Sequence, residues 1–310
     1  MNQSKMYPVV GLMIGIIAVS TASILIRYAQ NGAPSIVIAA NRLILASLVI
    51  TPIAYIQFKK NLFKVTSKEF FFLLLSGLFL ALHFAAWITS LEKTSIASSV
   101  VLVTTTPLWV ALFSPILLKE KNNSGIWIGL FLSLVGSSLV ALSNDCSFSS
   151  EQLIRCDNLS INLNQNTFLG NFLALFGAWM AAGYMMAGRK LRSTIPLIKY
   201  VTFVHLISSF FLLFFVFIAG ESLIGYSNST YLWMVLLGLI PQLLGHSLFN
   251  WALGHLPAAF VSIALIGEPI GTIILAFIFL QETPTSLEFL GGGFILLGIF
   301  LVSVLNTKKI

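Results

Sequence analysis

Long apolar runs, separated by short polar or charged segments, follow one another along almost the whole chain. A run of about 20 apolar residues is long enough to cross a bilayer as a helix, whereas a barrel strand would be about half as long and would alternate. Proline stands in the first turn of several runs, where its missing N–H costs nothing. The pattern predicts membrane-spanning helices near residues 8–27, 34–57, 70–91, 95–118, 125–143, 168–187, 196–219, 231–253, 257–280 and 287–305.

The composition supports a membrane protein. Of the 310 residues, 57% are hydrophobic and 9% are charged, whereas about 25% of the residues of a soluble domain carry a charge. Lipid cannot satisfy free backbone groups, so spanning segments must be helices or closed barrels. We therefore expect an all-α integral membrane protein with ten transmembrane helices surrounded by the lipid bilayer.

The positive charge of the chain indicates its orientation. The formal net charge is +7, and most Lys and Arg residues fall in loops on the side of the N-terminus. Cytoplasmic loops are enriched in Lys and Arg, so both termini are expected in the cytoplasm. Because topology accounts for the basic balance, no nucleic-acid partner is expected. The apolar run after Lys5 is interpreted as the first span rather than a signal peptide.

Both cysteines, Cys146 and Cys156, lie in the one long polar loop. A disulfide between them is one interpretation if the loop faces an oxidising compartment, and two free thiols are the other.

An internal repeat relates the two halves of the chain. Each half holds five predicted spans, and because five is odd, equivalent positions lie on opposite faces of the membrane. Inverted repeats are typical of carriers whose substrate site lies between the halves. We expect a first repeat at 1–143, an external loop at 144–167 and a second repeat at 168–310. An offset of 162 maps Arg27 to Arg189, Pro34 to Pro196, Pro107 to Pro269, Glu120 to Glu282, Gly129 to Gly291 and Gly136 to Gly298.

Two pairs of segments carry a family resemblance. PLWVALFSPILLKE (107–120) and PIGTIILAFIFLQE (269–282) each place a glutamate thirteen residues after a proline, and GAPSIVIAANRL (32–43) and GGGFILLGIFLV (291–302) add to the pattern. The chain resembles the EamA-type members of the drug/metabolite transporter superfamily. The resemblance implies ten helices with cytoplasmic termini and carriage of a small metabolite, in some members in exchange for protons.

The second half carries an acid in the middle of a span. Glu268 would be costly in lipid, so its side chain must face protein or water. Gly267 and Pro269 flank it and favour a broken helix lining a cavity, with Pro107 as the matching kink in the first half. Glu268 either binds a cationic group or carries a proton. The alternative is that it bonds a neighbouring helix and fixes the kink.

Arg42, preceded by Asn41, is the other formal charge well inside a span. Three interpretations are open for its guanidinium: it reaches outward to the interface, pairs with an acid such as Glu268, or grips an anionic group of the substrate.

Histidines fall near the centres of three spans, at His83, His205 and His246. Imidazole titrates near neutral pH, so at least one is expected to line an aqueous path, with His205 the weakest candidate in its aromatic-rich helix. No metal site is expected, because none has a ligand-type partner three or four residues away.

Further polar and aromatic residues suit a cavity for a ligand with a planar or apolar part. Gln242, His246 and Asn250 recur at helical spacing and form a polar stripe that must point inward. The remaining candidates for binding are Trp87, Thr104, Thr105 and Tyr184.

The motifs of common enzymes are missing from the sequence, so no enzyme and no cofactor are expected. The leading hypothesis is a multi-pass secondary-active transporter of the prokaryotic cytoplasmic membrane. It would export a small metabolite, an amino acid or related compound, by alternating access, with proton coupling left open. The alternatives are a facilitative exchanger or importer of a nucleotide-like or vitamin-like metabolite and, in another class, a channel or lipid scramblase.

Overall fold

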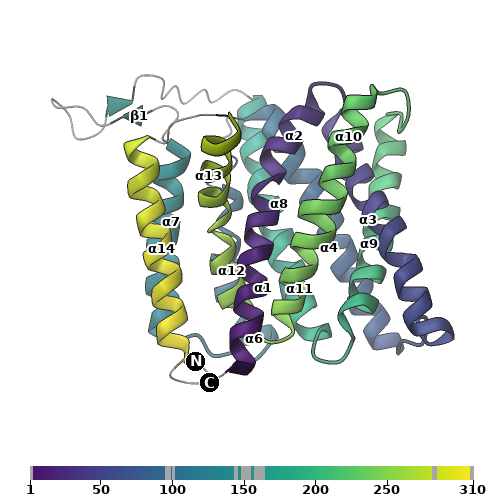
Figure 1. Ribbon diagram of the computed structural model, residues 1–310, viewed down its shortest axis with the longest axis horizontal. Helices are drawn as coiled ribbons and strands as arrows, with labels where there is room; N and C mark the ends of the chain where they lie inside the picture. Colours follow the sequence, from purple (N-terminus) through teal and green to yellow (C-terminus); the bar gives the residue numbers. More distant parts are fainter. Residues whose placement is uncertain are drawn as a thin grey trace.

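The computed structural model describes residues 3–94, 99, 102–142, 146–147, 155–156, 165–280 and 285–307. Helices form nearly all of this part of the chain (Figure 1). The first half contains α1 (Gln3–Ser20), α2 (Ala22–Gln30), α3 (Ser35–Phe58), the 3-10 helix η1 (Lys59–Asn61), α4 (Ser67–Lys93), α6 (Thr106–Leu117) and α7 (Ser124–Leu142). The rest contains β1 (Cys146–Ser147), β2 (Arg155–Cys156), α8 (Gln165–Leu191), α9 (Leu197–Ala219), α10 (Asn228–Leu237), the π-helix η2 (Gly238–His246), α11 (Ser247–Leu253), α12 (Ala258–Leu265), α13 (Glu268–Leu280) and α14 (Ser286–Thr307).

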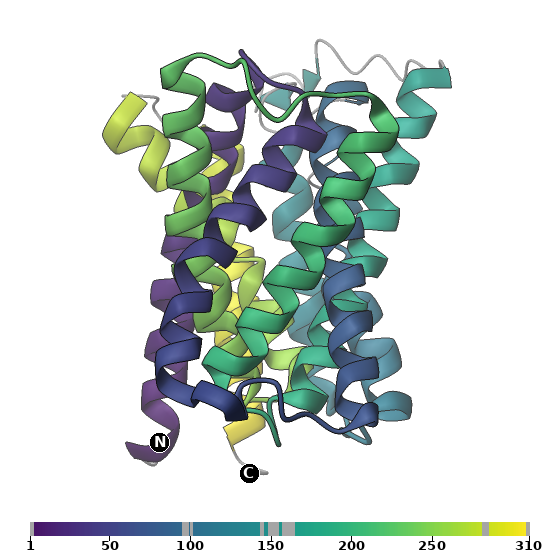
Figure 2. The same ribbon diagram turned by 90° about the vertical axis from the view of Figure 1, so that its right-hand side faces the viewer.

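The helices run along a common direction, and both ends of the chain lie at the same end of the bundle (Figures 1 and 2). Within the described residues, 7 helical segments are long and apolar enough to cross a membrane, and three shorter apolar helices, Thr106–Leu117, Ser124–Val140 and Phe289–Val302, accompany them. A helical multi-pass membrane protein is therefore confirmed. The number of spans and the cytoplasmic side of the termini stay predictions.

A two-residue strand pair, β1 and β2, departs from the purely helical expectation. Its antiparallel register places the backbone of Cys146 opposite that of Cys156. The two interpretations of this pair, a disulfide and two free thiols, both stay open.

The helix that carries Glu268 is interrupted. α12 ends at Leu265, Ile266 and Gly267 form a turn, and α13 begins at Glu268. The first half has a matching interruption, because Thr104 and Thr105 form a turn before α6 begins. Pro107 and Pro269 each stand as the second residue of the new helix, where no hydrogen bond is lost.

The sequence pattern missed the interruption at Thr21 between α1 and α2, and it missed the π-helix η2. A regular helix was predicted over residues 231–253, but a wider turn surrounds Pro241. Proline lacks the N–H that would continue the ladder, and π-turns of this kind are frequent at functional sites.

Glycines allow α7 and α14 to cross closely. The Cα of Gly129 faces the carbonyl of Gly298, and that of Gly136 faces the carbonyl of Gly291, so a side chain at these positions would collide with backbone. Gly136 follows Gly129 in α7, whereas its partner Gly291 precedes Gly298 in α14, so the two helices are antiparallel. Since α14 is the counterpart of α7 at an offset of 162, equivalent helices run in opposite directions.

A second contact joins equivalent positions directly. The hydroxyl oxygens of Ser47 in α3 and Ser209 in α9 lie 3.1 Å apart, and the two residues are 162 apart in sequence. Equivalent residues touch only near a two-fold axis, so this contact and the glycine crossing are what two inverted repeats would produce.

Candidate functional site

A cavity of about 130 Å³ lies inside the bundle, between residues 19–107 and residues 181–268. Its volume is about tenfold that needed to hold one water and below the ~300–1,000 Å³ of drug-sized pockets. The cavity therefore suits a small metabolite. The lining residues with polar side-chain atoms are Arg42, His83, Trp87, Thr104, Thr106, Tyr184, His246, Asn250, Ser262 and Glu268.

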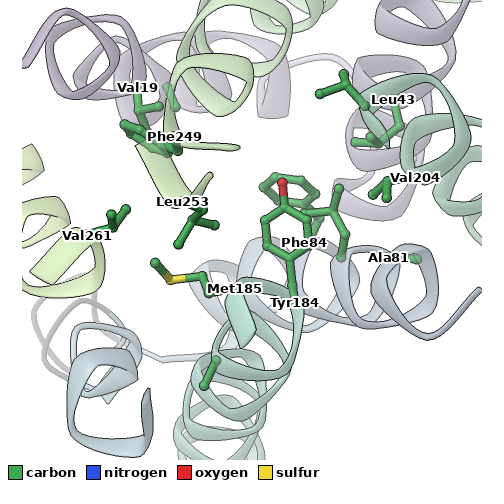
Figure 3. Close-up of a cluster of buried hydrophobic side chains, with 14 of the residues drawn as sticks. Val19, Leu43, Ala81, Phe84, Tyr184, Met185, Val204, Phe249, Leu253 and Val261 are labelled. Atoms are coloured by element: carbon green, nitrogen blue, oxygen red, sulfur yellow. The ribbon is translucent and has the colours of Figure 1, made fainter. Parts of the chain in front are cut away.

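Apolar side chains form the rest of the wall. Val19 of α1, Phe84 of α4, Tyr184 of α8 and Phe249 of α11 line the cavity and belong to the buried cluster drawn in Figure 3. Close packing supports this wall: a Cβ on Gly15 would meet the Phe249 ring. The wall leaves a cavity that is mostly apolar with a few polar groups, as is usual for metabolite sites.

Most of the lining follows the internal repeat. In seven cases, a lining residue of the first half has a counterpart in the second half, at a residue number higher by 162, that also lines the cavity. A pocket built in this way lies on the axis that relates the two halves. The pairs are Val19 and Ala181, Ala22 and Tyr184, Phe84 and His246, Trp87 and Phe249, Val103 and Leu265, Thr104 and Ile266, and Thr106 and Glu268.

The chemistry of these pairs is asymmetric. Glu268 stands where the first half has Thr106, and His246 stands where it has Phe84. Arg42 has Val204 as its counterpart, which does not line the cavity. The shape of the pocket therefore follows the repeat, whereas its ionisable groups do not.

Arg42 is buried, with 1% of its surface exposed, so it does not reach outward to the interface. Its Nε donates to Oε1 of Gln242 at 2.8 Å, and the guanidinium carbon lies 4.1 Å from the centroid of the Phe84 ring. Among the described residues, neither terminal nitrogen has a hydrogen-bond partner, and Glu268 forms no ion pair with it. The outward orientation of Arg42 is therefore contradicted, whereas pairing with an acid and binding of an anionic group stay predictions.

Glu268 begins α13, where the helix dipole favours a negative charge. Its backbone carbonyl accepts hydrogen bonds from the hydroxyls of Ser20 (3.0 Å) and Thr272 (3.2 Å). These contacts tie the helix break to α1 through the main chain. The carboxylate itself lines the cavity and has no hydrogen-bond partner within the described part of the chain.

Two histidines face the cavity in different ways. Nδ1 of His83 lies 2.9 Å from the carbonyl oxygen of Gly177, and because a carbonyl can only accept, this nitrogen carries a hydrogen. The His83 ring also stacks on Trp87, with centroids 5.8 Å apart. His246 packs against Phe84 and Phe249, and its Nδ1 has no partner among the described residues.

The predicted polar stripe is divided between two roles. Asn250 lines the cavity and donates to the hydroxyl of Tyr184 at 2.5 Å. Gln242 lies behind the cavity wall, where it holds Arg42 and contacts His205. Gln242 and His246 both lie in the π-helix η2, whereas Asn250 lies in α11.

Some of the other predicted residues line the cavity and some do not. Asn41 bonds to the carbonyl of Val37 in its own helix, and Thr105 bonds to that of Leu102. Phe84 was missed, although the offset of 162 from His246 could have identified it. Predicted residues that line the cavity are Arg42, His83, Trp87, Thr104, Pro107, Tyr184, His246, Asn250 and Glu268, and those that do not are Asn41, Thr105, Gln242, Gly267 and Pro269.

An ion pair links the loop after α6 to the end of α8. Nε of Arg189, at the end of α8, donates to Glu120, which follows α6, at 2.5 Å. Glu120 also accepts from the backbone N–H of Ala258 at 3.0 Å, and Arg189 donates to the carbonyl of Leu253. The two bonds of Glu120 join the first half of the chain to the second. Among the described residues, no three side chains of the metal-ligating types converge.

These features define a multi-pass helical membrane protein with a metabolite-sized cavity between two related halves. The sequence profile of the EamA-like transporter family matches residues 6–142 and 168–304. The chain belongs to this family, which confirms the resemblance seen in its sequence.

Relatives support the same assignment. The chain is 27% identical to an uncharacterized transporter of Synechocystis, over 79% of this chain and 68% of that protein. It is 24% identical to an uncharacterized transporter of Archaeoglobus fulgidus, over 86% of each. Mouse solute carrier family 35 member G1 is 23% identical over 86% of this chain and 70% of its own. A crystal structure with 15% identity has the same fold, with a TM-score of 0.77 over 97% of this chain and 98% of the other.

Proposed function

We propose that the protein is a secondary-active transporter that carries a small metabolite by alternating access. The observation that carries the proposal is the cavity lined by residues paired at an offset of 162. A site on the axis between inverted repeats can open to either side when the halves move relative to each other. The proposed topology has ten spans with both termini in the cytoplasm of a prokaryotic cell.

The contacts between the two halves at one end of the bundle argue for a carrier over a channel or scramblase. Glu120, Arg189 and Ala258 connect the two halves at the end of the bundle where the termini lie. In the proposed cycle this end opens only when the opposite end closes. The proposed cargo is an amino acid or a related compound, and the proposed direction is export.

Counterflow in proteoliposomes tests the carrier. Vesicles containing the full chain are preloaded with unlabelled amino acids and supplied with labelled ones outside. Saturable uptake that is accelerated by the preload supports a carrier, whereas linear flux that ignores the preload contradicts it. Phe217→Ala is a matched control, because Phe217 is 81% exposed on the outer surface of α9 and should leave the flux unchanged.

Glu268 is proposed to couple transport to protons or to bind a cationic group. Replacing it with glutamine removes the charge and keeps the size. In Glu268→Gln, we expect the stimulation of flux by a pH gradient to disappear, or the affinity for a cationic substrate to fall. Unchanged flux together with unchanged dependence on the gradient would remove Glu268 from both roles.

A further inference from the structure

We infer that the cavity binds its ligand through a single carboxylate held by the two terminal nitrogens of Arg42, and that Gln242 and His205 are positioning residues for this guanidinium. The inference rests on the proposed function, because it takes the cavity as the substrate site, and it narrows the class of substrate.

The first observation is the unpaired end of Arg42. Both terminal nitrogens are buried and have no hydrogen-bond partner in the described residues, while the residue lines the cavity. A buried charged donor without a partner is costly, and such groups are normally paired. The two terminal N–H groups of a guanidinium match the two oxygens of a carboxylate. The missing partner is therefore an anion with this geometry.

The second observation is how the guanidinium is held. Arginine can only donate, so the amide oxygen of Gln242 must face Nε of Arg42. The amide nitrogen then faces Nε2 of His205, at 3.0 Å, and donates to it. From the opposite side, Phe84 packs against the guanidinium face. Gln242 thus occupies Nε and leaves the terminal nitrogens for a ligand.

The third observation is the charge of the cavity. Arg42 is the one Lys or Arg among the described lining residues, and Glu268 contributes an acid to the same wall. A doubly charged group such as a phosphate monoester would exceed the single positive charge available. The single negative charge of a carboxylate would instead match the single positive charge of Arg42. Glu268 is then neutralised by a proton or by an ammonium group of the same ligand.

The fourth observation is the remaining wall. Trp87, His246 and Asn250 each present a buried polar atom without a partner among the described residues, and all three line the cavity. Apolar and aromatic surface makes up most of the rest. The ligand should therefore combine its carboxylate with a compact, mainly apolar body and one or two further polar groups.

Matched probes test the inference on the full-length protein in detergent. The panel contains the proteinogenic amino acids and short monocarboxylates, each beside its methyl ester, with inorganic phosphate added. For the leucine series, the probes are leucine, leucine methyl ester, 4-methylpentanoate and 3-methylbutylamine. Binding is measured by calorimetry and by the shift of the thermal midpoint.

At least one acid of the panel is expected to bind about 10- to 100-fold more tightly than its ester, as charge-assisted hydrogen bonds predict. Binding of leucine without 4-methylpentanoate would mean that the ammonium is also recognised, and binding of both would mean that it is not. Equal binding of acids and esters would overturn the inference, and so would stronger binding of phosphate.

Variants separate the roles. Arg42→Gln should lose the discrimination between acid and ester. Arg42→Lys should recover only part of it, because the lysine ammonium lacks the two parallel N–H donors that match a carboxylate. Gln242→Leu should reduce the ratio of acid to ester affinity, which a purely structural residue would leave unchanged. An Arg42→Gln protein that is folded and keeps the wild-type ratio would refute the assignment. If this variant does not fold, the ratio in the wild-type protein still decides.

The two proposals can fail separately. Saturable counterflow of a solute without a carboxylate, with no acid of the panel bound, would refute the carboxylate site and leave the carrier intact. Flux without saturation or counterflow would refute the carrier itself.

Discussion

In the proposed alternating-access cycle, weakening the ion pair between Glu120 and Arg189 should shift the equilibrium between the two states of the transporter. The pair joins the halves of the chain at one end, so it must break whenever that end opens. Glu120→Gln keeps the shape and an acceptor oxygen but removes the charge. The state in which the ion pair is formed should lose stability relative to the state in which it is broken.

The size of the effect follows from the partial exposure of the pair. The Arg189 and Glu120 side chains are 25% and 18% exposed. A fully buried charged hydrogen bond contributes about 1.5–3 kcal/mol and an exposed ion pair about 0–1 kcal/mol, so we take ~1 kcal/mol. This corresponds to a shift of about fivefold in the ratio of the two states.

Cysteine labelling from the side of the termini measures this ratio. Ser262 lines the cavity and is buried, so Ser262→Cys, made with both native cysteines replaced by serine, reports access to the cavity. Glu120→Gln should accelerate labelling about fivefold, and the exchanged pair Glu120→Arg with Arg189→Glu should restore part of the wild-type rate.

Arg192→Gln is the matched control. Arg192 lies near the same end of the bundle, but it donates to the carbonyls of Asn250 and Ile195, which belong to its own half. Removing this guanidinium should leave the labelling rate unchanged. Equal acceleration in both variants, or none in Glu120→Gln, would refute the role of the ion pair as a gate.

Three further predictions concern stability, measured by thermal unfolding in detergent. Gly136→Val should cost about 1–3 kcal/mol by overpacking the crossing of α7 and α14, whereas Gly293→Ala, with open space around its Cα, should be neutral or stabilising. Lys199→Met should cost about 1–3 kcal/mol, because buried Lys199 donates to two loop carbonyls, those of Asn61 and Lys64, and an unchanged midpoint would contradict this. Thr66→Ala should cost about 1 kcal/mol by removing the capping box of α4, and no loss would show that the cap is not needed in detergent.

The membrane fold could be predicted because its causes are local in sequence. Apolar runs separated by charged loops mark the helices, and proline and glycine at 267–269 mark the break that the structure shows before Glu268. The π-turn around Pro241 could not be predicted from hydrophobicity, since its wider hydrogen-bonding pattern leaves the apolar pattern unchanged. Single-sequence reasoning identifies the spans but not the irregular turns inside them.

The cavity was predictable only in part, for a related reason. Charged and polar residues in mid-span must face inward, which selected Arg42, Glu268 and both lining histidines. That rule does not distinguish residues that line a cavity from those that hold a lining residue in place. Gln242 shows the difference, because it faces inward and yet contacts Arg42 from behind the wall.

The helices of this protein follow the internal repeat, whereas the ionisable groups of its cavity do not, and the two features have different physical causes. In the proposed cycle both ends must close in turn, and a frame of equivalent contacts, such as the two glycine crossings between α7 and α14, is what such a cycle requires. A metabolite has no such symmetry, so a site that discriminates one end of it needs a charge on one side only. Arg42 and Glu268 each lack a charged counterpart among the described lining residues. A symmetric frame around an asymmetric set of ionisable groups would therefore hold the ligand in one orientation while presenting it to either side.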